Sequence, residues 1–205
     1  MKPEHNYRLK TLSSFETYDV YQLRLSNGYY HQFMRNMLHV NTGSNGFLEL
    51  GELAGVSSTD WSWGALMVDF DNDGSKEIFV CNGIYKDVTD QDFVEFLGSS
   101  DQIKSAIEGK KIDFKQFVDK MSSQKLSNYL FTKTNDWSYA NRSEEWGLAE
   151  PSFSNGAAYG DLDNDGDLDL IINNVNQEVF VYKNLSVENK SGNSLSLSPA
   201  TWRHR

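Results

Sequence analysis

Carboxylate side chains recur at alternate positions in two short segments, which we call loop 1 (residues 69–77) and loop 2 (residues 161–169), with Ser75 as the one exception in loop 1. Both contain Asp-x-Asp-x-Asp-Gly, with a further carboxylate three residues after the glycine. So many like charges in one loop repel one another unless a cation neutralises them. Calcium takes about six to eight oxygen ligands, and side chains at alternate positions of a coiling loop can converge on it. The spacing therefore predicts one Ca²⁺ site in each loop, about two ions in all.

The predicted ligands occupy positions 1, 3, 5, 7 and 9 of each loop. Positions 1, 3 and 5 supply side chains, and glycine at position 6 permits the sharp turn. Position 7 supplies its backbone carbonyl, and a carboxylate at position 9 closes the shell. The longer side chain of Glu77 predicts weaker binding in loop 1. The predicted ligands are Asp69, Asp71, Asp73, Ser75 and Glu77 in loop 1, and Asp161, Asp163, Asp165, Asp167 and Asp169 in loop 2.

Other interpretations of these loops fit less well. An EF-hand needs a glutamate at position 12 and flanking helices, but position 12 is Val80 or Ile172, within an apolar run. Magnesium prefers strict octahedral geometry with retained water. The remaining alternative is a metal-free turn whose Asp and Asn side chains cap their own backbone. A second copy in register favours the metal sites over that alternative.

The two loops belong to an internal repeat. One offset of 92 residues, from position 69 to position 161, aligns the loops and the segments before them without a gap. Chance similarity of two acidic turns would not extend so far upstream, so we infer a duplicated structural unit. Identical residues at this offset include Asn36 and Asn128, Leu38 and Leu130, Gly55 and Gly147, Ser62 and Ser154, and Gly64 and Gly156.

Short β-branched and apolar runs surround both loops and are separated by Gly, Asn and Asp turns, which predicts an all-β fold. Each loop is expected to join two buried strands. In the first unit we expect strands near 37–40, 47–50, 64–69 and 78–81, and in the second near 129–132, 139, 156–161, 168–172 and 179–182.

Two segments depart from this β pattern. Apolar residues at helical spacing near 93–97, 103–107 and 114–121 predict two or three short helices over 84–125, inserted between the two repeat units. Their apolar stripes are expected to pack on the rest of the chain, with a role in assembly as the alternative. Residues 185–205 are rich in Ser, Asn and Lys without periodicity, and we expect a disordered or aberrant tail.

Composition narrows the classes of function. The formal charge of -10 disfavours a nucleic-acid partner, since phosphate binding needs a basic surface. No run reaches the roughly 18 apolar residues of a membrane span.

The single cysteine, Cys81, permits no internal disulfide, and its place in a predicted strand indicates a buried, unreactive thiol. No nucleophilic triad motif is present. Trp61, Trp63 and Trp146 are expected to pack in the core, with sugar stacking as the alternative.

The acidic loop following a small-residue strand resembles the FG-GAP/VCBS repeats of integrin-α-like β-propellers. The similarity is greater still to bacterial surface proteins related to cartilage acidic protein. It extends over most of residues 6–184, and the loop motif is its most specific part. The segments with this resemblance are 36–38, 53–56, 61–65, 69–74, 82–87, 145–148 and 154–159.

This resemblance implies a partial β-propeller of about two FG-GAP/VCBS-type blades with an inserted small helical segment. The expected regions are a first blade (1–83), the insertion (84–125), a second blade (126–184) and the tail (185–205). Two blades cannot close a ring, and no apolar signal peptide follows Met1. We therefore expect a piece of a longer exported propeller chain.

The implied function is binding or adhesion, without catalysis, at the cell surface or outside it; in a bacterium this would be the periplasm or outer membrane. Calcium would be structural, and the partner an unidentified protein or glycan. The alternative is a carbohydrate-active enzyme, or an accessory domain of one, that uses the carboxylates as acid and base.

Overall fold

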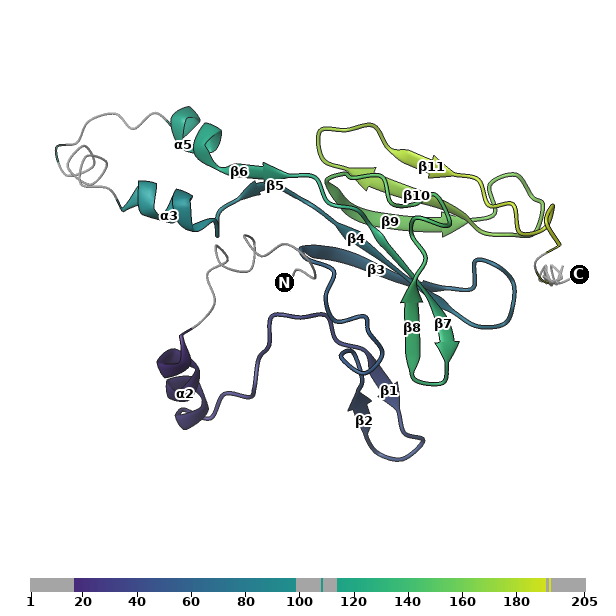
Figure 1. Cartoon of the computed structure of the whole chain (residues 1–205), viewed down its shortest axis with the longest axis horizontal. Helices are drawn as coiled ribbons and strands as arrows, with labels where there is room; N and C mark the ends of the chain where they lie inside the picture. Colours follow the sequence, from purple (N-terminus) through teal and green to yellow (C-terminus); the bar gives the residue numbers. More distant parts are fainter. Residues whose placement is uncertain (1–16, 99–107, 109–113, 191, 193–205) are drawn as a thin grey trace, which may run out of the picture.

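The structure is a computed structural model that describes residues 17–98, 108, 114–190 and 192. It consists mostly of short antiparallel strands with a few short helices (Figure 1). The all-β prediction is confirmed at this level. In chain order the elements are α2 (Tyr18–Ser26), β1 (His39–Asn41), β2 (Phe47–Glu49), β3 (Ser62–Val68), β4 (Glu77–Asn82), β5 (Ile84–Asp87), α3 (Gln91–Leu97), α5 (Phe114–Lys120), β6 (Ser122–Gln124), β7 (Tyr129–Asn135), β8 (Ser138–Asn141), β9 (Ser154–Gly160), β10 (Asp169–Asn174) and β11 (Phe180–Tyr182).

These strands form two main sheets and two separate two-stranded ribbons. The larger sheet has the order β3-β4-β7-β8, and the smaller has the order β11-β10-β9. The ribbons are β1-β2 and β5-β6. Within the described residues the sheets do not close into a barrel or a propeller ring. The number of blades and the propeller itself therefore stay predictions.

The repeat is visible in space as two equivalent hairpins. Loop 1 joins β3 to β4, and loop 2 joins β9 to β10, and both loops lie at the same end of the molecule (Figure 1). The first strands of the hairpins approach closely where the repeated glycines meet. A Cβ atom added to Gly64 would lie 3.7 Å from the Cα atom of Gly156. Glycine at both equivalent positions lets the two backbones come together here.

The main core lies where the two sheets pack against each other. Its buried residues include Phe79 and Leu130 from the larger sheet and Ile172 from the smaller, and all three are fully buried. A second cluster covers the other face of the larger sheet, where Val80 and Phe131 pack against Val56. All six residues of β4 are buried, as expected for a strand covered on both faces.

The described helices of the predicted insertion, α3 and α5, lie within the expected range 84–125. Because β4 and β7 are neighbours in one sheet, the chain between them leaves that sheet and re-enters it. The β5-β6 ribbon forms the base of the insertion and carries α3 and α5. Sheet pairing thus joins the end of the first repeat to the start of the second. The stripe predicted near 103–107 lies outside the described residues.

The first residues of the predicted tail form a turn. Residues 185–190 follow β11 as a turn that packs against both acidic loops. Hydrogen bonds hold this turn in place, because Ser186 Oγ donates to Phe70 O and Val187 N donates to Asp167 Oδ2. The predicted tail beyond residue 192, and the first 16 residues of the first blade region, lie outside the described part of the chain. No helix in the described residues is long and apolar enough to cross a membrane.

Truncation at the junction between the sheets should destabilise the fold strongly. Leu130 is fully buried between them, and Leu130→Ala should lower the free energy of unfolding by about 2–5 kcal/mol. Leu48→Ala, at a side chain that is 52% exposed on β2, should change it by no more than about 0.5 kcal/mol. Urea unfolding followed by tryptophan fluorescence measures both, and equal effects would contradict this assignment of the core.

Candidate metal centre

The two loops share most of their internal hydrogen bonds. Position 1 accepts twice from the backbone: Asp69 accepts from Asp73 N at 3.1 Å and from Gly74 N at 3.0 Å. In loop 2, Asp161 accepts from the amides of residues 165 and 166, at 3.2 Å each. Position 5 then accepts from the amide of position 7, at 2.6 Å in loop 1 and 3.1 Å in loop 2. The duplicated sequence therefore folds into duplicated geometry.

Left-handed backbone at positions 4 and 6 gives each loop its coil. Asn72 and Asn164 have φ values of 57° and 63°, and Gly74 and Gly166 have 88° and 100°. Asparagine and glycine adopt this region more readily than other residues. This is the sharp turn that the Asn-Asp-Gly sequence predicts.

Position 9 is the first residue of a buried strand in both repeats. Glu77 is 1% exposed, and one of its carboxylate oxygens accepts from Phe70 N at 2.8 Å. Asp169 is 2% exposed and accepts from Leu162 N at 2.9 Å. The closing carboxylate is thus pinned across the base of each loop by the amide of position 2.

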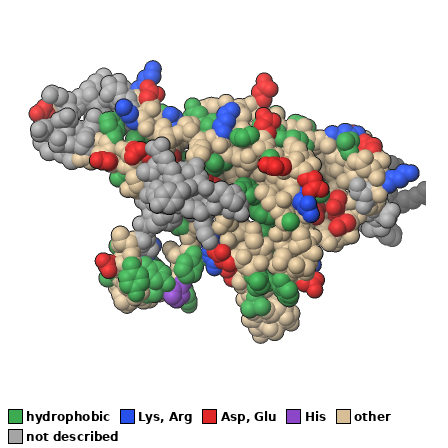
Figure 2. Space-filling view, viewed as in Figure 1, with side chains coloured by type: hydrophobic (Ala, Val, Ile, Leu, Met, Phe, Trp, Pro, Cys, Tyr) green, Lys and Arg blue, Asp and Glu red, His purple; other side chains and the backbone are tan. Residues whose placement is uncertain are grey.

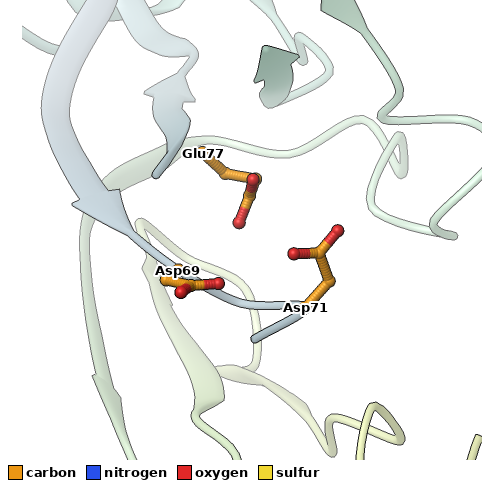
Figure 3. Close-up of side chains that lie close together, drawn as sticks. All are labelled: Asp69, Asp71 and Glu77. Atoms are coloured by element: carbon orange, nitrogen blue, oxygen red, sulfur yellow. The ribbon is translucent and has the colours of Figure 1, made fainter. Parts of the chain in front are cut away.

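In loop 1, three of the predicted ligands come together. Asp69, Asp71 and Glu77 each offer an oxygen, and these oxygens lie within 4.8 Å of one another. Figure 3 shows the carboxylates of Asp71 and Glu77 directed toward each other, with Asp69 beside them. Asp73 is not in this group, and its side chain accepts from the amide of Ser75.

In loop 2, the carboxylates divide differently. Asp161, Asp163 and Asp165 form one group within 4.8 Å, the set predicted for positions 1, 3 and 5. Asp169 is not in it, and its two oxygens accept from the amides of Leu162 and Asn184. Asp167 instead joins Asp165 and Glu188 in another group within 4.8 Å. The sequence predicted only a carbonyl ligand from position 167 and did not identify Glu188.

Burial and mutual repulsion make the loop 1 carboxylates hard to ionise. Burial raises the pKa of Glu77 to about 7, and the charges of Asp71, Asp73 and Asp69 add to the effect. Burial, followed by the charge of Asp73, also raises the pKa of Asp71. Among the described residues, no Lys or Arg forms an ion pair with loop 1. A divalent cation is the counter-charge that this arrangement suits.

A lysine contributes positive charge to loop 2. The ammonium of Lys183 lies 2.6 Å from Asp163 Oδ2 and 2.9 Å from Glu188 Oε1. It also lies 3.5 Å from Asp165 Oδ2. Its hydrogen bond with Asp163, and then that with Glu188, raises the pKa of Lys183. Loop 2 therefore carries more carboxylates than loop 1, together with one partly exposed cation.

A short stretch after β11, which we call the closing segment (residues 183–189), ties the two loops together. The side-chain amide of Asn184 donates to Phe70 O at 2.6 Å and to Leu168 O at 3.1 Å. Ser186 Oγ donates to Phe70 O at 2.9 Å. This role could not be predicted from the sequence, because the segment has neither the strand period nor the helix period.

A cavity of about 380 Å³ lies between the loops beneath the closing segment. Its walls combine core residues such as Leu148 and Leu170 with the polar side chains of Asp71, Lys183 and Asn184. Figure 2 shows acidic side chains crowded at this end of the molecule, to the right in the view. The two candidate cation sites and the cavity thus share one region.

The remaining chemistry-bearing residues have structural contacts. Cys81 is 1% exposed, and burial raises the pKa of its thiol to about 12, so the predicted buried cysteine is confirmed. Trp146 packs against the main core. Trp63 is 56% exposed and donates from its indole nitrogen to Gly83 O at 2.6 Å, so its predicted place in the core is wrong.

A scan against models of known protein families finds no match for this chain, and a search of curated proteins finds none either. The geometry of the loops is therefore the basis for any functional assignment, and the resemblance to FG-GAP/VCBS repeats stays a prediction.

Without calcium, the stability of the protein should fall as pH rises from about 5 to 8. The pKa of Glu77 is higher in the folded chain, about 7 against 4.5, so the folded state binds more protons in this range. The contribution is fully present below pH 4.5 and is lost as pH passes through 7, up to about 3 kcal/mol. Urea unfolding in EDTA across this range measures the slope.

Glu77→Gln should flatten this pH profile, because glutamine keeps an acceptor for Phe70 N and carries no charge. Asp136→Asn, at a side chain that is 88% exposed outside both loops, should keep the wild-type slope. A wild-type profile in Glu77→Gln would show that another group controls the effect.

Proposed function

We propose that this chain is a calcium-binding β-propeller repeat module of a secreted or cell-surface protein. Loop 1 and loop 2 would each hold one Ca²⁺ ion, and the ions would stabilise a surface used for binding or adhesion. The chain would be part of a longer propeller of the FG-GAP/VCBS type. The ligand would be a protein or a glycan, and the chain would have no catalytic activity of its own.

The observation that carries the proposal is the duplicated loop geometry. Both loops have the same amide contacts to positions 1, 5 and 9, and each gathers three carboxylates within 4.8 Å. Calcium suits flexible shells of carboxylate and carbonyl oxygens, whereas magnesium needs near-ideal octahedral geometry. The repetition argues against a chance cluster of surface acids.

Capping of the backbone accounts for only part of each loop. In loop 1, Asp69, Asp71 and Asp73 each accept from backbone amides, as in a metal-free turn. Glu77 accepts from Phe70 N with one oxygen, but its buried carboxylate also faces Asp71. Burial and the charges of neighbouring aspartates raise the pKa of both Asp71 and Glu77, and a cation between them would offset this cost. A bound ion turns this repulsion into stabilisation.

Calcium should raise the melting temperature of the chain. At about 100 times the dissociation constant, one site contributes about 2.7 kcal/mol. For a chain of this size, this corresponds to roughly 5–10 °C per site. Thermal unfolding in EDTA, in millimolar calcium and in equal magnesium measures the effect, which should be largest with calcium.

Asp71→Asn and Asp163→Asn should each remove about half of the calcium-induced shift, since each variant weakens one loop. Asp136→Asn serves as the matched control because it lies outside both loops, and it should keep the full shift. A folded wild-type chain whose melting temperature does not respond to calcium would refute the proposal. An equal response in all variants would place the ion elsewhere.

The enzyme alternative has weaker support. Glycosidases separate their two carboxyl groups by about 5–5.5 Å or 6.5–9.5 Å across a cleft. The grouped oxygens of both loops lie within 4.8 Å of one another, and Glu77 is buried. This crowding suits a metal ion better than proton transfer to a sugar. Turnover of a glycan by the wild type, lost in a folded Glu77→Gln variant, would revive the alternative.

A further inference from the structure

Loop 2 contains a second group of acids that loop 1 does not have. Asp165, Asp167 and Glu188 each offer an oxygen, and these oxygens lie within 4.8 Å of one another. Asp165 belongs to both groups of loop 2, while Glu188 comes from the closing segment. In loop 1, position 7 is Ser75, and among the described residues only one group forms there.

Two oxygens of this second group are buried without a hydrogen-bond donor. Asp167 is 0% exposed, and its Oδ1 atom has no partner, while its Oδ2 atom accepts from Val187 N at 3.1 Å. Asp165 Oδ2 is also buried and accepts no hydrogen bond, and its nearest cation is Lys183 Nζ at 3.5 Å. A buried carboxylate oxygen without a donor is costly. Such atoms in a native fold point to an ion or ordered water.

The nearby lysine does not satisfy these atoms. Lys183 pairs with Asp163 and Glu188 and lies 3.5 Å from Asp165 Oδ2, and Asp167 Oδ1 receives no donor from it. The lysine side chain is 50% exposed, so it can turn toward solvent at small cost. Lys183 would then compete with a divalent cation for the carboxylate of Glu188, and would not be its permanent counter-ion.

We propose that Asp165, Asp167 and Glu188 form a third divalent-cation site that joins loop 2 to the closing segment. The inference rests on the proposed function in taking Ca²⁺ as the ion. Asp167 would bind through its side chain, and Glu188 would reach in from the segment that also contacts loop 1 through Ser186. The ion would thereby fix the closing segment over both loops.

The competing explanation is a proton shared between Asp165 and Asp167. Burial, and then the neighbouring charge of Asp165, raises the pKa of Asp167, as a shared proton would require. The two explanations differ in the number of calcium ions bound near neutral pH. They also differ in the role of Glu188, which a shared proton does not need.

Calcium stoichiometry tests the proposal directly. Equilibrium dialysis of the whole chain against CaCl₂ should give three ions per chain for the wild type. Glu188→Gln and Asp167→Ser should each give two, the second by restoring the residue that loop 1 has at this position. Asp71→Asn should lose its ion from loop 1, so the Asp71→Asn and Glu188→Gln double variant should bind one.

The possible outcomes separate this inference from the proposed function. Two ions in the wild type, unchanged in Glu188→Gln, would overturn the third site and leave the loop sites intact. No bound calcium in a folded chain would overturn both. Loss of two ions in Glu188→Gln would also count against it, because Glu188 would then belong to the loop site.

Lys183→Met gives a second readout that a structural role for Glu188 would not produce. Removing the ammonium 2.9 Å from Glu188 should tighten the weakest calcium site by roughly twofold to fivefold, the range that exposed ion pairs show. Hydrogen exchange should show calcium-dependent protection of the Val187 amide in the wild type and in Lys183→Met, but not in Glu188→Gln. Identical protection in all three would overturn the proposal.

Discussion

The strongest constraint on this fold is the burial of a carboxylate at the start of each central strand. Glu77 begins β4 and Asp169 begins β10, and both are almost fully buried. A buried charge is tolerated only when hydrogen bonds, a proton or a cation compensates it. The amide of position 2 supplies one hydrogen bond in each loop. The other carboxylates and amides of each loop lie around the negative charge of this buried carboxylate, which one hydrogen bond compensates only in part.

This constraint connects the acidic loops with the apolar core. The strands that begin at these carboxylates continue into the junction between the two sheets, where Phe79 and Ile172 are completely buried. The position of each carboxylate is therefore fixed by packing that is unrelated to metal binding. A rigid scaffold that holds ligands at defined places reduces the ordering required when an ion binds.

The two repeats have diverged in how they balance their charge. Loop 1 keeps serine at position 7 and raises the pKa of Glu77. Loop 2 has aspartate there and recruits Lys183 and Glu188 from beyond β11. The closing segment then contacts the backbone of both loops through Asn184. The closing segment therefore links the two proposed ion sites through hydrogen bonds from one residue.

The sequence by itself determined the features that depend on local spacing. The 92-residue repeat, the positions of nine of the strands, and the coil of each loop follow from apolar periodicity and from asparagine and glycine at left-handed positions. The β5-β6 ribbon and helix α2 were missed because each is short and has no clear period. Ten ligand positions were named, and the loops gather six of them into their two main groups.

Only the tertiary structure decided how distant segments pair. The larger sheet combines β3-β4 of one repeat with β7-β8 of the next. The helical insertion therefore lies in the connection between two neighbouring strands of that sheet. This strand pairing depends on which apolar faces meet. The repeat pattern is compatible both with one sheet shared by the two repeats and with a separate sheet for each repeat. The roles of Asn184, Ser186 and Glu188 depend on side-chain contacts with loops far away in the chain. Such contacts leave no periodic trace in a sequence, because only the folded backbone brings the partners together.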